Sequence, residues 1–343
     1  MSEAPPLWLC PPPGPHRREA LRDQLAAWTS STALAALVEM FDASVPRTDS
    51  LSERLTWLDE FSARWDFRRM ARERAEAKAS TSQDAGGAAR WELLDSGLDP
   101  SQERRVLELA SALGLVDNHQ PERSRVDFLL ILGGARLSNL LRPRYASELI
   151  AADLVKPAHI VLLGGSRPVM DGERDATDSY APGAATEFDL LTTAAAAEFG
   201  FDPEAREEQF HRDPQNANAS WRVWDVPATE TAAGAAVIAV EAPSPEPDAR
   251  RANTADSYAF FADRFRLRPG AACLLVTSQI YVPYQHLEGV RSLALPFELE
   301  LETVGFPADW EADLQGMQGP VNYLQETRST IQAARRLGDA LNG

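Results

Sequence analysis

The sequence predicts an α/β fold: a Rossmann-like, mostly parallel sheet sandwiched by helices, with an all-helical N-terminal region. Two apolar runs, Val126–Leu132 and His159–Leu163, are each followed directly by a pair of glycines. A segment with helical periodicity joins them, which is the pattern of a βαβ unit. Continuous apolar strands that alternate with helices are typical of a parallel sheet buried on both faces.

Three further strand candidates extend this pattern, at Ala236–Glu241, Ala272–Ser278 and Leu299–Val304. Helical segments are expected between the strands, over residues 143–154, 184–199, 252–265 and 283–293. Residues 202–233 interrupt the alternation with an acidic segment that contains tryptophan. We expect this segment to be an insertion that lies over the edge or the mouth of the sheet.

The chain divides into four parts. Residues 1–15 are rich in proline and predict an extended arm. Residues 16–120 predict a helical region, with Ser50 and Asp99 as helix N-caps and a flexible polar loop at residues 79–88. Residues 125–310 form the predicted Rossmann-like domain, and residues 311–343 add a C-terminal helix.

Composition limits the classes of partner. The chain of 343 residues has 51 acidic and 34 basic residues, a net charge of −17, which disfavours nucleic acid and anionic membranes. Its two cysteines, Cys10 and Cys273, are too few for a disulfide framework or a cysteine-based zinc site. No apolar run approaches the roughly 20 residues that span a bilayer, and the first residues do not resemble a secretory signal. We therefore expect a cytoplasmic protein.

The two glycine turns predict one half of a ligand site, because ligands of open α/β sheets bind outside the carboxyl ends of the strands. Backbone N–H groups and guanidinium forks favour a phosphate or a carboxylate there. The candidate binding residues are Gly133, Gly134, Arg136, Arg144, Gly164, Gly165, Ser166 and Arg167. Neither a Walker loop nor a G-x-G-x-x-G fingerprint is present, so the turns name no reaction. The alternative is that the glycines only make tight turns and the arginines are solvated.

Later strands add the other half of the predicted site. Glu241 ends a strand and is the candidate base or hydroxyl acceptor, unless it merely faces solvent. Tyr281 is the second catalytic candidate. The remaining candidate ligand-binding residues are Asn253, Thr254, Thr277, Ser278 and Tyr284. The acidic loop at 171–178 has oxygen ligands for Mg²⁺ or Ca²⁺, but its spacing fits no EF-hand and favours a solvated loop. His286 is more simply structural than catalytic.

These motifs, in this order, resemble the DUF218 family, the SanA/ElyC/YdcF-like α/β proteins, over about residues 125–305. The matching segments are Leu132–Gly134 with Arg136 or Arg144, Leu163–Gly165, Glu241 with Asn253–Ser257, and Val276–Ser278. The family's histidine, arginine and last asparagine fall on Tyr281, Tyr284 and Ser257. The resemblance implies a Rossmann-like fold whose site has diverged in its chemical half.

The sequence thus favours an enzyme that acts on a small anionic metabolite, nucleotide-like or phosphorylated, with a hydrolase or transferase preferred. The first alternative is a ligand-binding or sensor module at the same edge without turnover. The second is a scaffold whose helical N-terminal region recruits a partner. A divalent cation and S-adenosylmethionine are the two cofactor candidates, no metal ligand is assigned, and a homo-oligomer is one expected assembly.

Overall fold

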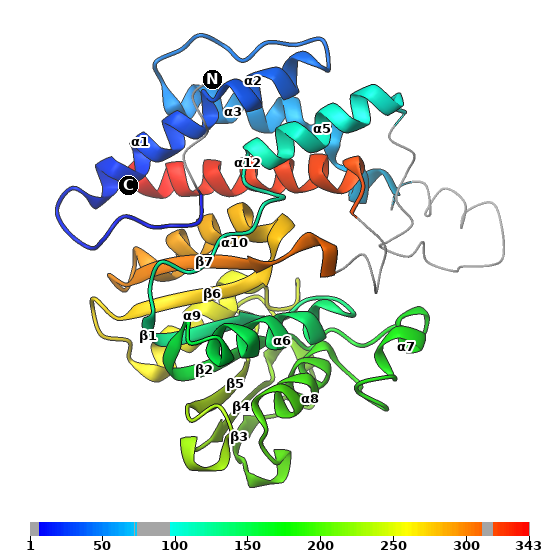
Figure 1. The fold of residues 1–343 in the computed structure, drawn as a ribbon, viewed down its shortest axis with the longest axis vertical. Helices are drawn as coiled ribbons and strands as arrows, with labels where there is room; N and C mark the ends of the chain where they lie inside the picture. Colours follow the sequence, from blue (N-terminus) through cyan, green and yellow to red (C-terminus); the bar gives the residue numbers. More distant parts are fainter. Residues whose placement is uncertain (1–6, 72, 74–96, 311–317, 343) are drawn as a thin grey trace.

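A seven-stranded sheet forms the centre of the protein (Figure 1). The computed structural model describes residues 7–71, 73, 97–310 and 318–342, and the strand order within them is β3-β4-β5-β2-β1-β6-β7. The strands are β1 Arg125–Leu132, β2 Lys156–Gly164, β3 Glu207–His211, β4 Trp221–Val226, β5 Ala236–Glu241, β6 Ala272–Ser278 and β7 Glu300–Phe306. Strands β5, β2, β1, β6 and β7 are parallel, and β3 and β4 are antiparallel.

Helices cover both faces of this sheet, as the apolar strands predicted. Side chains of β1 alternate between two cores: Leu129 and Ile131 pack with α6 and α8, whereas Leu130 and Leu132 pack with α9 and α10. The helices are α6 Ser138–Ala151, α8 Glu187–Phe199, α9 Thr254–Phe265 and α10 Val282–Gly289. The starts of α8 and α9 therefore lie on opposite faces of the sheet, a placement that matters for the site.

A separate helical layer lies beyond β7 (Figure 1). Its members are α1 Arg17–Thr29, α2 Thr32–Glu39, α3 Leu51–Ser62, α5 Pro100–Ala112 and α12 Pro320–Asn342. The C-terminal helix α12 contacts α1, α3 and α5 and also α10, so it joins this layer to the sheet. Ser50 and Asp99 accept hydrogen bonds from the first turns of α3 and α5, so both predicted caps are present.

Shorter helical elements lie between these. They include η1 Ala63–Trp65, α7 Asp171–Thr177, η2 Pro203–Ala205, η3 Ala217–Ala219, η4 Ala228–Glu230, η5 Gln279–Tyr281 and the π-helical turn η6 Val290–Ala294. Helix α6 begins five residues before the predicted start at 143, and Pro143 lies inside the helix rather than at its first position.

Residues 202–233 contain the two strands that the sequence pattern missed. They form β3 and β4, which extend the sheet beyond β5 rather than lying over it. All five residues of β3 are exposed, so the strand carries no apolar alternation to reveal it. Net acidity made the segment resemble an insertion.

The N-terminal arm closes the opposite edge of the sheet. Cys10 N donates to Leu301 O at 2.9 Å, and Thr303 N donates to Trp8 O at 2.8 Å, so the arm pairs with the outer side of β7. The predicted loop at 79–88 lies outside the described residues. None of the described helices has the length and apolar character that crossing a membrane requires.

Candidate functional site

A cleft of about 580 Å³ opens at the carboxyl ends of β1 and β2. One wall comes from the turn after β2 and the start of α8, and the other from residues 250–254 and the start of α9. The lining residues are Leu132, Gly133, Leu163, Gly164, Gly165, Ser166, Arg167, Glu187, Arg250, Arg251, Ala252, Asn253, Thr254 and Ser257. Seven of the predicted site residues are in this set: Gly133, Gly164, Gly165, Ser166, Arg167, Asn253 and Thr254.

Packing explains why glycines occupy the turns. Gly133 N donates to Leu163 O at 2.7 Å, and a Cβ on Gly133 would lie 2.8 Å from that oxygen. A Cβ on Gly164 would lie 2.8 Å from Cδ2 of Phe188. Both approaches are shorter than side chains tolerate, so these glycines bring β1, β2 and α8 together. Gly134 lies outside the lining, against Ser138.

Arg167 is engaged by two carboxylates in the wall on the α8 side. Its Nη1 and Nη2 donate to Glu173 at 2.9 and 2.8 Å, and its Nε donates to Glu187 Oε1 at 2.7 Å. Burial opposes the charge of Arg167, but these hydrogen bonds outweigh burial and raise its pKa. Glu187 therefore sits in the cleft as a fixed carboxylate, and Arg167 orients it rather than offering its fork to a ligand.

The wall on the α9 side is cationic. Arg250 donates to Glu246 Oε2 at 2.9 Å and to Asp256 Oδ2 at 2.5 Å. The neighbouring Arg251 is exposed, and its guanidinium makes no hydrogen bond or ion pair with the described residues. Sequence reasoning missed Arg251, although two arginines directly before a helix N-cap at this edge of a sheet were a visible signal.

Asn253 has a structural task at the start of α9. Its Oδ1 accepts from Ala255 N at 2.9 Å and from Asp256 N at 3.2 Å, which caps the helix. The same residue lines the cleft, so the cap fixes the position of the cationic wall. Thr254 and the buried Ser257 follow on the helix and face the same space.

Arg142 occupies the place where this strand order would put a ligand. The order of the parallel strands reverses between β1 and β6, and such a switch point is the usual crevice of the fold. Arg142, 2% exposed, donates there to Leu132 O at 2.8 Å, to Gly133 O at 2.6 Å and to Ser278 Oγ at 3.3 Å. The side chain bridges the two strand ends, and the cleft lies on the β2 side of it.

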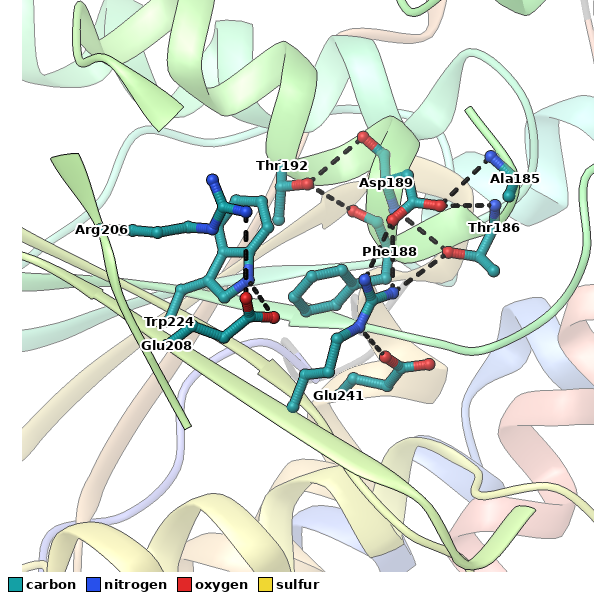
Figure 2. Close-up of polar contacts among 10 residues, drawn as sticks. Ala185, Thr186, Phe188, Asp189, Thr192, Arg206, Glu208, Trp224 and Glu241 are labelled. Atoms are coloured by element: carbon teal, nitrogen blue, oxygen red, sulfur yellow. Dashed lines mark hydrogen bonds and ion pairs between the residues drawn. The ribbon is translucent and has the colours of Figure 1, made fainter. Parts of the chain in front are cut away.

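Glu241 belongs to an ion-pair network outside the cleft lining (Figure 2). Arg222 of β4 donates through Nε to Glu241 Oε2 at 2.5 Å and through both Nη atoms to Asp189 Oδ1 at 3.3 Å. The Oδ2 atom of Asp189 in turn accepts from Thr186 N at 2.9 Å. The network ties β4 and β5 to the start of α8. The predicted base is thus held by a guanidinium and lies apart from the cleft.

The remaining predicted residues are dispersed. Arg136 has a left-handed backbone with φ of 48°, and Arg144 lies on the exposed side of α6, 3.6 Å from Glu148. Thr277 is fully buried. Tyr281 and Tyr284 pack at the edge of the larger apolar core, toward the helical layer. None of these side chains lines the cleft.

Two further candidates from the sequence, His286 and the acidic segment at 171–178, have structural roles. His286 is buried, its Nδ1 lies 2.9 Å from Thr303 Oγ1, and burial lowers its pKa to about 3. The acidic segment after β2 forms α7, where Glu173 binds Arg167. The described residues hold no cluster of three or more His, Cys, Asp or Glu side chains arranged for a metal ion.

Comparison with known proteins identifies the relatives. A family model described as the Rv3785 N-terminal domain matches residues 12–114. Rv3785 of Mycobacterium tuberculosis strain H37Rv is 40% identical over 336 residues, which cover 96% of this chain and 93% of that protein. The chain belongs to the Rv3785 family. Mb3814 of Mycobacterium bovis is equally similar, and no solved structure matches.

The predicted resemblance to the DUF218 family is wrong, because the matches place the chain in the Rv3785 family. The motifs behind that resemblance have local structural causes. Gly133 and Gly164 allow close packing of strand ends, and Glu241 pairs with Arg222. Such features recur wherever parallel strands end at a crowded edge, so their order alone does not define a family.

Proposed function

We propose that the cleft binds a small anionic metabolite that carries a phosphate and hydroxyl groups, and that the protein is a ligand-binding or sensor module. The observation that carries this proposal is Arg251, an exposed guanidinium on the wall of a 580 Å³ cleft. The volume falls within the range of about 300–1,000 Å³ that is typical of small-molecule sites.

The cationic wall suits the anionic end of such a ligand. Arg251 offers a planar fork that matches phosphate oxygens. The start of α9 adds the positive end of a helix dipole next to it. The N–H groups of Ala255 and Asp256 are already bonded to Asn253, so the start of α9 contributes mainly its field while Arg251 contributes a fork of N–H donors.

The opposite wall suits the hydroxyl end. Glu187 is an acceptor with two oxygens, and Arg167 fixes its orientation. Ser166 and the backbone of Gly165 lie beside it. Because α8 and α9 start on opposite faces of the sheet, the carboxylate and Arg251 face the cleft from different sides. A sugar phosphate or a nucleoside monophosphate has this polarity.

A thermal-shift series tests the proposal with inorganic phosphate, ribose, ribose 5-phosphate, adenosine monophosphate, S-adenosylmethionine and Mg²⁺. The expected result is a rise in Tm with the phosphorylated compounds, larger for ribose 5-phosphate than for phosphate or ribose alone. If none of the phosphorylated compounds raises the Tm, the proposal is refuted.

A hydrolase or transferase is the second candidate function. It is favoured by Glu187, because this residue places a carboxylate in the lining of the cleft. Its ion pair with Arg167 already engages the carboxylate, which is why binding without turnover is preferred. Product formation from a stabilising phosphorylated compound, abolished in Glu187→Gln, would favour the enzyme.

A cytoplasmic location belongs to the same proposal, in keeping with Cys10 and Cys273 as buried free thiols.

A further inference from the structure

The cationic wall of the cleft has less positive charge to offer than its two arginines suggest. The guanidinium of Arg250 lies between two carboxylates, with Nε 2.9 Å from Glu246 Oε2 and Nη1 2.5 Å from Asp256 Oδ2. Glu246 belongs to the loop after β5, and its side chain is 64% exposed. Among the described lining residues, Arg251 is thus the one arginine that no carboxylate holds.

The charge balance of the whole cleft is not positive. In the opposite wall, Glu173 and Glu187 hold Arg167. Four carboxylates therefore stand against the three guanidinium groups of the lining. The charge of Arg136 also acts on Glu173 and compensates part of this excess. Each further phosphate of a nucleoside di- or triphosphate adds negative charge that these groups do not balance.

The glycine turn after β1 has no backbone donors to spare for a second phosphate. Gly133 N donates to Leu163 O at 2.7 Å, and Gly134 N donates to Asn139 Oδ1 at 2.9 Å. Sites that hold polyphosphates cradle them with the N–H groups of such a turn. Here both groups serve the packing of the turn, so a second phosphate would lose water without gaining these donors.

We propose that the cleft selects phosphate monoesters against nucleoside di- and triphosphates, and that Glu246 is a specificity-determining residue for this choice. The selection rests on the proposed function, since it concerns the same anionic ligand. Arg251 binds the single phosphate, and Glu246 together with Asp256 offsets the charge of Arg250 that would attract a second one. A cationic cleft would show the opposite order, in which each added phosphate raises the affinity.

Calorimetric titrations of ribose 5-phosphate and of adenosine mono-, di- and triphosphate into the full chain test the selection. Low ionic strength preserves the charge effect, and EDTA keeps divalent cations from neutralising the added phosphates. One unit charge acting on another across about 7 Å of water changes a dissociation constant about threefold. Relative to the tighter of the two monoesters, each added phosphate is therefore expected to weaken binding about two- to threefold.

Glu246→Gln tests the specificity-determining residue, because it removes one negative charge beside Arg250 and keeps the shape of the side chain. The variant is expected to strengthen binding of the diphosphate about two- to threefold more than binding of the monoester. Glu108→Gln is the matched control. Glu108 Oε2 also lies 2.9 Å from an arginine, Arg105, and its side chain is also 64% exposed, but it belongs to α5 outside the cleft lining.

The outcomes separate this selection from the proposed function. A di- or triphosphate that binds the wild type as tightly as the monoester, or more tightly, would overturn the selection. A ratio of affinities that is the same in Glu246→Gln as in the wild type would overturn the role of Glu246. If none of the four compounds binds, the proposed function itself is refuted, and the selection falls with it.

Discussion

Glu241→Gln separates a structural role from a catalytic one. The variant keeps the shape of the side chain and one acceptor but removes its charge. In the native protein Glu241 is 8% exposed and accepts from Arg222 Nε at 2.5 Å. Loss of the charge leaves Arg222 in a largely buried position with Asp189 as its remaining acidic partner. The variant should therefore unfold more easily.

The size of the effect follows from exposure. Removing one partner of a fully buried ion pair costs about 3–5 kcal/mol. The side chain of Arg222 is 29% exposed and retains Asp189, so solvent and the second carboxylate compensate for part of the loss. We expect the free energy of unfolding to fall by about 1–3 kcal/mol, close to the cost of an unsatisfied buried polar group.

Urea unfolding followed by circular dichroism measures this change, as a lower midpoint at an unchanged slope. Glu230→Gln is the matched control, because Glu230 is exposed and its side chain makes no hydrogen bond or ion pair with the described residues. A double-mutant cycle with Arg222→Met should give a coupling of at least about 0.5 kcal/mol. A Glu241→Gln variant as stable as the wild type would refute the ion-pair role.

Substitutions at three further positions test other parts of the structure. Asn253→Ala should lower the free energy of unfolding by about 1 kcal/mol through loss of the α9 cap, whereas Asn253→Asp should restore it, as urea titration will show. Gly133→Ala should destabilise the protein, because its Cβ would lie 2.8 Å from Leu163 O, and a Tm equal to wild type would contradict this packing. His286 has a pKa of about 3 in the folded protein and about 6.5 when unfolded, so acid favours the unfolded state. The wild type should lose stability as pH falls from 6.5 toward 3, by up to about 1.4 kcal/mol per pH unit from this residue, and His286→Gln should reduce that slope in urea titrations at several pH values.

The parallel strands were predictable because their residues are apolar on both faces. The predicted strands at Ala236–Glu241 and Ala272–Ser278 coincide with β5 and β6, and the other three differ from β1, β2 and β7 by a few residues at their ends. Strands β3 and β4 were not predictable in the same way. Strand β3 pairs on one side only and has no buried residue to produce a period of two. The buried residues of β4, which are Val223, Trp224 and Val226, do not alternate strictly either.

The missed strand β4 also explains why the sequence did not reveal the ion-pair partner of Glu241. From the sequence alone, Glu241 is a carboxylate at the end of a buried strand, next to the glycine turns. Its partner Arg222 lies in β4, and no spacing rule connects the two residues. Arg251 was missed for the opposite reason: a charged residue in a polar run resembles a solvated loop until the fold places it on a cleft wall.

The most direct test of the account is the titration of ribose 5-phosphate into the wild-type protein, Arg251→Ala and Arg268→Ala by calorimetry. Arg268 is an exposed arginine outside the cleft lining, so its loss controls for the general effect of charge. Saturable binding to one site is expected, weakened about tenfold or more in Arg251→Ala and unchanged in Arg268→Ala. Absence of binding, or equal affinity in all three proteins, would contradict it.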